Sequence, residues 1–116
     1  ELVFSLNEAT PPDAAVLSRP EVRASFRDAT IEAFRQGHRG PLHELRLLAR
    51  PWAFDPAEIT TATDIWHGCM DGVVPFAMAQ ALASRLPNAQ LRVLEEDGHL
   101  SPVYRHGRAI LQPLVP

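Results

Sequence analysis

Two segments of this chain predict β-strands, and each is followed closely by a segment that predicts a helix. Residues 60–67 are rich in β-branched side chains and lead into Gly68, and residues 91–94 form a shorter, mostly apolar run. Helices are predicted over 76–86 and about 101–111, between prolines that mark their starts and ends. A strand–helix–strand–helix order favours an α/β fold with a parallel sheet. Because two strands cannot form a stable parallel sheet alone, the pattern predicts an incomplete sheet that needs further strands.

The chain before residue 60 predicts helices and loops rather than strands. Apolar side chains recur at three- and four-residue spacing over 14–36, where Pro20 divides a short helix from a longer one. A second apolar stripe predicts a helix over 42–49. The loop that follows is expected to be packed, with Trp52 and Phe54 as its anchors.

Polar residues beside prolines mark two further positions. Pro11, Pro12 and Asp13 signal a turn or a helix start, because Asp can cap a helix and proline cannot lie in its interior. Ser101 is expected to cap the last helix, with Pro102 in its first turn.

The loops after the two predicted strands carry an acid and a histidine. Asp71 lies in the first loop, and His99 follows Gly98 in the second. In a parallel sheet both loops emerge at the carboxyl edge, where α/β proteins place their sites. A carboxylate there would bind one ring N–H of the imidazole and fix its tautomer. The other ring nitrogen would then act as general base and acid.

Structural roles are the simpler alternatives for these residues. Asp71 could be a turn carboxylate that caps the following helix, and His99 could be a histidine of a surface loop. His67 ends a strand and is interpreted as structural, and Cys69 as a small packing residue. Asp97 belongs to an acidic run that is expected to be a solvated loop or to shape the turn.

The second half of the chain resembles the last third of the α/β-hydrolase family. Residues 67–75 carry the pattern His-Gly-x-x-Asp-x-x-Val-Pro, and residues 79–89 carry Ala-x-x-Leu-Ala-x-x-Leu-Pro-x-Ala. The strand over 91–94, followed by the pair Gly98-His99, completes the pattern. The resemblance is strong over residues 50–116 and weak before them.

The resemblance implies roles and a domain division. Asp71 matches the triad acid of the family, and His99 matches the triad base. Residues 1–50 are expected to be a cap-like helical segment. Residues 51–116 are expected to be the C-terminal part of the α/β-hydrolase core. No cofactor is implied.

The nucleophile of that family is missing from this chain. The family needs an elbow, typically Gly-x-Ser-x-Gly, upstream of the acid. None of the serines has a glycine two residues away on both sides; they are Ser5, Ser18, Ser25, Ser84 and Ser101. The segment that forms the oxyanion hole is absent too. The resemblance therefore implies the C-terminal part of an esterase-like hydrolase for a small organic substrate, inactive alone, with Ser or Asp as nucleophile.

Two alternatives remain open at this point. The chain could be a complete, non-catalytic module that pairs with itself or with another subunit, because a short sheet has edges that need covering. A partner chain could also supply the nucleophile. The expected cover of the sheet edge is therefore either an N-terminal part of the same protein or a second subunit.

Composition and charge exclude several other classes of function. The net charge is −3 and the basic residues are all scattered arginines, so nucleic-acid binding is not expected. His38, His43 and His106 show no ligand spacing, so no metal site is predicted. No apolar run approaches a membrane span, and no signal peptide is apparent. With a single cysteine, the expectation is a cytoplasmic protein.

Overall fold

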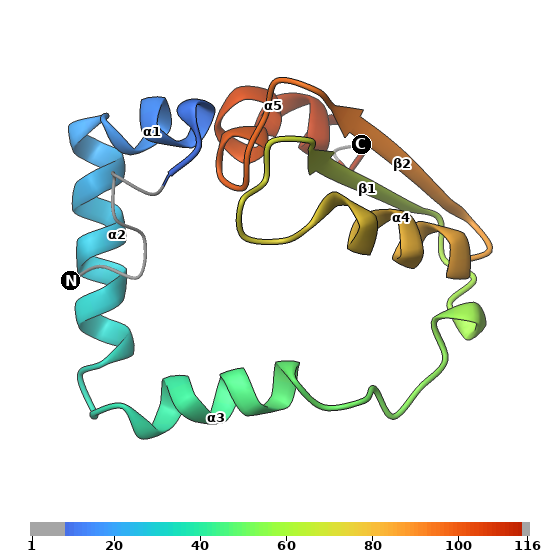
Figure 1. The fold of residues 1–116 in the computed structure, drawn as a ribbon, viewed down its shortest axis with the longest axis horizontal. Coiled ribbons are helices and arrows are strands. Elements are labelled where there is room, and N and C mark those ends of the chain that lie inside the picture. The colour runs from blue at the N-terminus through green and yellow to red at the C-terminus, as the bar shows by residue number, and fades with distance from the viewer. Residues whose placement is uncertain (1–8, 115–116) are drawn as a thin grey trace.

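The computed structural model describes residues 9–114 and has a mixed α/β fold. The described chain contains five α-helices and a two-stranded parallel sheet (Figure 1). Their bounds are α1 Pro11–Leu17, α2 Pro20–Ala33, α3 Arg39–Leu48, β1 Thr63–Gly68, α4 Phe76–Arg85, β2 Ala89–Leu94 and α5 Ser101–Leu111. Short 3-10 helices cover Pro56–Glu58 and Gln112–Leu114. The predicted order of helices and strands is therefore confirmed.

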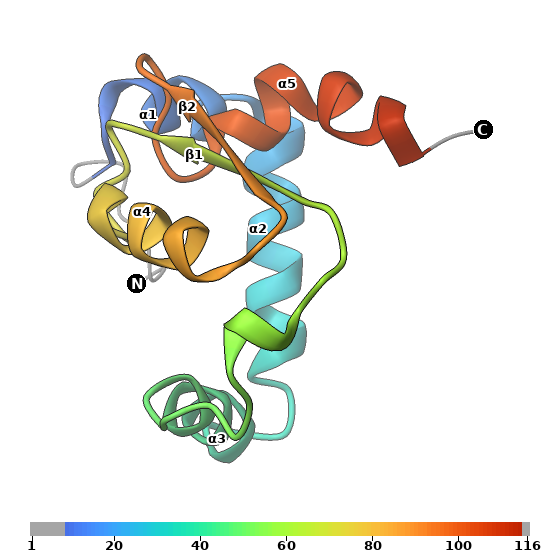
Figure 2. The ribbon, with the colours of Figure 1, turned by 90° about the vertical axis from the view of Figure 1, so that its right-hand side faces the viewer.

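The sheet is covered by one helix on each face. β1 and β2 pair in parallel, with Gly68 opposite Leu94 at their carboxyl ends. Neighbouring strand residues point to opposite faces. His67 lies against Phe76 of α4, and Trp66 stacks on the ring of His106 in α5. Figure 2 shows α4 and α5 on the two sides of the sheet.

The N-terminal helices α1 and α2 pack on each other, and α1 connects them to the C-terminal half of the chain. α1 packs against both α2 and α5. A small hydrophobic cluster of Val16, Leu17 and Val22 is extended by Phe26 and by Leu100, which directly follows His99. Pro20 starts α2, as predicted, and Gly37 turns the chain towards α3 with a φ of 88° that favours glycine. α2 and α3 extend away from the sheet (Figure 1).

Trp52 and Phe54 do not anchor a packed loop. Their rings stack on each other at a centroid distance of 5.4 Å, but the residues are 55% and 53% exposed. The prediction was wrong for these two rings, whereas Pro56 of the same loop is buried and begins a short helix that packs against α4. Large apolar side chains of α3 are exposed as well, among them Leu45 and Leu48.

The described chain is not compact. The radius of gyration of 16.1 Å exceeds the roughly 13 Å of a compact domain of this length.

Candidate active site

Two loops at the carboxyl ends of β1 and β2 form the candidate site. The loops are joined by backbone hydrogen bonds, from Cys69 to Leu94 (2.9 Å) and from Met70 to the carbonyl of Asp97 (2.8 Å). Gly68 allows this contact, because a Cβ there would overlap the carbonyl oxygens of Asp97 and Gly98. The end of each strand is therefore fixed relative to the other.

The structure brings Asp71 and His99 together across these loops. Nδ1 of His99 lies 2.9 Å from Oδ2 of Asp71. The other oxygen, Oδ1, accepts the backbone N–H groups of Val73 and Val74, both at 2.8 Å. Asp71 therefore also makes the turn contacts of the structural alternative, with one oxygen for each task. The Asp71 side chain is 4% exposed and that of His99 is 31% exposed, so the carboxylate is buried beneath a ring that solvent reaches.

The surroundings of Asp71 keep it ionised. Burial by itself would raise the pKa of Asp71. Hydrogen bonds from the Val74 backbone, the His99 ring and the Val73 backbone outweigh this effect and hold the pKa below its ordinary value. An ionised carboxylate accepts the Nδ1–H of a neutral imidazole, which leaves the basic lone pair on Nε2.

His67 lies next to the same carboxylate but is not hydrogen-bonded to it. Its Nδ1 is 3.7 Å from Oδ2 of Asp71, which is too long for a hydrogen bond. Within the described residues, its Nε2 is a buried polar atom without a hydrogen-bond partner. His67 therefore lies beside the Asp71–His99 pair without sharing its hydrogen bond.

The start of α5 is capped by a residue of α1 and not by Ser101. Leu100 occupies the N-cap position, and the Oγ of Ser101 accepts the backbone N–H of Gly98 at 2.8 Å. The backbone N–H groups of Leu100 and Ser101 donate instead to the carboxylate of Asp13. The capping prediction was wrong because a carboxylate distant in sequence already occupies this helix end.

Asp97 is a buried, paired residue rather than part of a solvated loop. It is 3% exposed, and its carboxylate lies 3.0 Å from Nη1 of Arg105 and 2.8 Å from Nε2 of His106. Burial alone would raise the pKa of Asp97, but hydrogen bonds from Ser101 and His106 and the charge of Arg105 lower it. These contacts connect the loop before His99 to α5.

The interpretation of Cys69 as a packing residue was also wrong, because its side chain is exposed.

The lowered pKa values of Asp71 and Asp97 predict acid sensitivity. A carboxyl with a depressed pKa stabilises the folded state above its unfolded pKa, about 3.9, and this stabilisation is lost as the pH falls through the folded pKa. We expect the free energy of unfolding to fall steeply below about pH 4. Denaturant unfolding at pH 3 to 6 measures this. The Asp97→Asn variant should start less stable and lose less on acidification; an equally steep loss would contradict the assignment.

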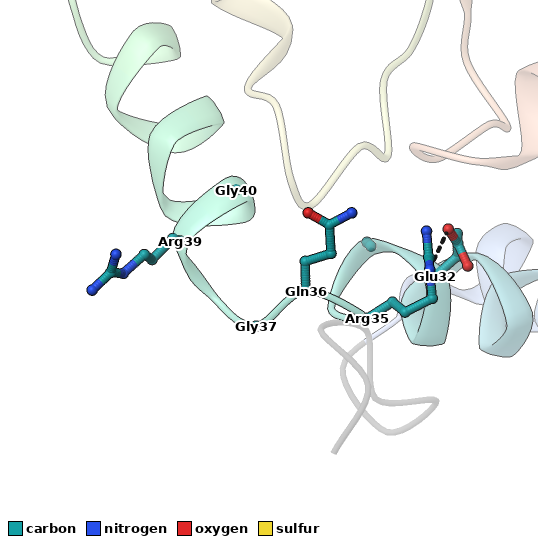
Figure 3. A pocket seen from close by; sticks show the side chains of 7 residues that line it. Glu32, Arg35, Gln36, Gly37, Arg39 and Gly40 are labelled. Atoms are coloured by element: carbon teal, nitrogen blue, oxygen red, sulfur yellow. Dashed lines mark hydrogen bonds and ion pairs between the residues drawn. The ribbon is translucent and has the colours of Figure 1, made fainter.

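A hollow of about 450 Å³ lies away from this site, at the turn between α2 and α3. Figure 3 shows Arg35 paired with Glu32 at its wall, while Arg39 points away from both. The residues that line this hollow are all exposed, so no buried side chain points into it.

In residues 9–114 no cluster of three metal-ligating side chains occurs. No helix in that range is both long and apolar enough to cross a membrane.

No protein-family model, curated protein or solved structure matches this chain. A function therefore has to come from the chemistry of the side chains that the two loops bring together. Asp71 and His99 form the carboxylate–imidazole pair that joins the loop after β1 to the loop after β2.

Proposed function

We propose that this chain is the C-terminal part of an α/β-fold hydrolase, esterase-like, that acts on a small organic substrate. The single observation that supports this proposal best is the 2.9 Å contact between Asp71 and His99 at the carboxyl ends of two parallel strands. The acid precedes the histidine in the chain, in the order that α/β hydrolases use. Asp71 is the triad acid of the proposal, and His99 is its base.

The proposed chemistry assigns one task to each residue. Asp71 holds Nδ1–H of His99 and stabilises the imidazolium that forms. With a serine nucleophile, Nε2 of His99 takes the hydroxyl proton while the serine oxygen bonds to the ester carbonyl carbon. The same proton then goes to the departing alcohol. Water repeats the sequence and releases the acid and the serine. With an aspartate nucleophile, His99 would activate the water of the second step.

The proposal places the nucleophile and the oxyanion donors outside residues 1–116. In this proposal residues 1–50 are the cap-like segment, and residues 51–116 are the C-terminal part of the core. The proposed hydrolase is a cytoplasmic protein and uses no cofactor. The two-stranded sheet supports it, because parallel sheets normally contain more strands. Exposed apolar residues such as Leu48, Trp52 and Phe54 also fit a surface that packs against more protein.

Hydrolysis of p-nitrophenyl butyrate tests the proposal. We expect protein expressed from its complete gene to hydrolyse this ester with saturation kinetics. A preparation of residues 1–116 alone should give only the background rate, because it has no Gly-x-Ser-x-Gly elbow. Turnover by residues 1–116 alone that disappears in the His99→Ala variant would contradict the placement of the nucleophile. No turnover of esters, amides or other small electrophiles by the complete protein would contradict the hydrolase.

A non-catalytic pairing module is the second candidate. The exposed apolar side chains of α3, together with a sheet of only two strands, favour a chain that associates with a copy of itself or with another subunit. Size-exclusion chromatography with light scattering distinguishes the candidates. A stable dimer of residues 1–116 with no ester turnover from the complete protein would favour the module. A well-folded monomer would count against it.

A further inference from the structure

The carboxylate of Asp13 holds the backbone of the His99 loop. Asp13 belongs to α1 and is 5% exposed. Its Oδ2 accepts the backbone N–H of His99 at 2.7 Å, across 86 residues of sequence. Its Oδ1 accepts the N–H groups of Leu100 at 2.9 Å and Ser101 at 3.0 Å. The hydroxyl of Thr10 donates to Oδ2 at 3.2 Å and orients the carboxylate.

These contacts do more than cap a helix. The first N–H groups of a helix have no partner within the helix, and a local side chain usually satisfies one of them. At α5 a single carboxylate from another element accepts three successive N–H groups, beginning with that of His99 itself. The negative charge also lies at the positive end of an 11-residue helix. The peptide plane of His99 is therefore fixed from outside its own loop.

Close packing at Gly98 and the hydrophobic cluster around α1 hold Asp13 against the His99 loop. A Cβ at Gly98 would overlap Oδ2 of Asp13 and would lie 2.5 Å from Oγ1 of Thr10. The φ of Gly98 is not in the left-handed region, so close approach is the reason for glycine at this position. α1 is held in place by Val16 and Leu17, whose cluster includes Leu100.

His99 is thus bound by two carboxylates, through its backbone by Asp13 and through its ring by Asp71. We propose that Asp13 is a positioning residue that sets where the imidazole of His99 lies, and so the rate of the chemical step. This inference rests on the proposed function of His99 as a base. Asp13 touches no reacting atom; it acts through His99. A displacement of about 1 Å at a reacting group can cost roughly 100-fold in rate.

The Asp13→Asn variant is the sharpest test, because it changes one acceptor into a donor at nearly constant shape. Whichever way the amide lies, its NH₂ faces at least one of the three backbone N–H groups. Asp28→Asn is the matched control, since Asp28 is exposed and pairs only locally with Arg27. The readouts are amide hydrogen exchange at residues 99–101, the NMR resonance of the His99 Nδ1 proton, and kcat and KM for p-nitrophenyl butyrate.

The inference predicts a specific set of changes in Asp13→Asn. Exchange at residues 99–101 should accelerate at least about tenfold. The His99 Nδ1 proton should shift or broaden, and kcat should fall about 10- to 100-fold with KM little changed. Asp28→Asn should change none of these. A folded Asp13→Asn variant with an unaltered Nδ1 resonance and unaltered kcat would overturn the inference.

A second variant covers the case in which Asp13→Asn does not fold. Thr10→Val replaces the hydroxyl that donates to Oδ2 of Asp13 with a methyl group of similar size. We expect the amide of His99 to exchange faster and its Nδ1 proton to shift or broaden, as in Asp13→Asn but to a smaller extent; no change in either would overturn the inference. The two NMR readouts do not depend on turnover. If they respond while the wild-type protein hydrolyses nothing, Asp13 positions His99 but the proposed function fails.

Discussion

The His99→Ala variant of the protein expressed from its complete gene is expected to lose hydrolysis almost completely. Removing the base of a triad leaves the nucleophile with no group to take its proton, and kcat should fall by a factor of about 10⁴ or more. KM should stay within a few-fold, because in the proposed mechanism the imidazole acts in the chemical step. The His99 side chain is 31% exposed, so its truncation opens no cavity in a packed core.

Steady-state kinetics with p-nitrophenyl butyrate, at matched protein concentration and with circular dichroism to check folding, measure this loss. His38→Ala is the matched control, because His38 is an exposed histidine before α3 that makes no cap hydrogen bond with its side chain. Its kcat should equal that of the wild type. A folded His99→Ala variant that keeps more than about a tenth of the activity would show that His99 is not the base.

The Gly68→Ala variant is expected to be the most damaging small substitution for stability. A Cβ at Gly68 would overlap the carbonyl oxygens of Asp97 and Gly98, and neither is the tip of a flexible side chain. Relief requires the two loops to separate, which breaks the hydrogen bond from Met70 to Asp97. We expect a loss of more than about 3 kcal/mol in the free energy of unfolding.

Denaturant unfolding followed by circular dichroism measures that loss, with Gly107→Ala as the control. Gly107 lies within α5, and apart from its chain neighbours and the adjacent helix backbone, no atom of the described residues is within 4 Å of the place where a Cβ would stand. Alanine there should stabilise the helix by about 0.5–1 kcal/mol. If Gly68→Ala were within about 1 kcal/mol of the wild type, the close contact between the loops would not be a feature of the protein in solution.

The order of the elements and the meeting of Asp71 with His99 could be predicted from the sequence, because both depend on local patterns. Apolar spacing and proline positions mark the helices, and β-branched residues mark β1. Once two parallel strands are assumed, their following loops share one edge of the sheet, which brings the acid to the histidine. The structure places these two residues 2.9 Å apart.

The supporting contacts could not be predicted, because they join distant segments through polar atoms that leave no periodic pattern. Asp13 had the appearance of a local cap, yet it binds backbone groups 86 residues away or more. Asp97 had the appearance of one residue in a solvated acidic run, yet α5 folds over it and supplies Arg105 and His106. Close approach by Asp13 explains Gly98 better than turn geometry does.

The central claim is that Asp71 and His99 act as one catalytic unit, and a double-mutant cycle on kcat tests it most directly. Asp71→Asn keeps an acceptor for the backbone of Val73 but presents an NH₂ to Nδ1 of His99, which selects the wrong tautomer. We predict a loss of about 10³–10⁴ in kcat for this variant, and a double variant that is no less active than His99→Ala alone. Losses that multiply, or a fully active Asp71→Asn variant, would contradict the claim.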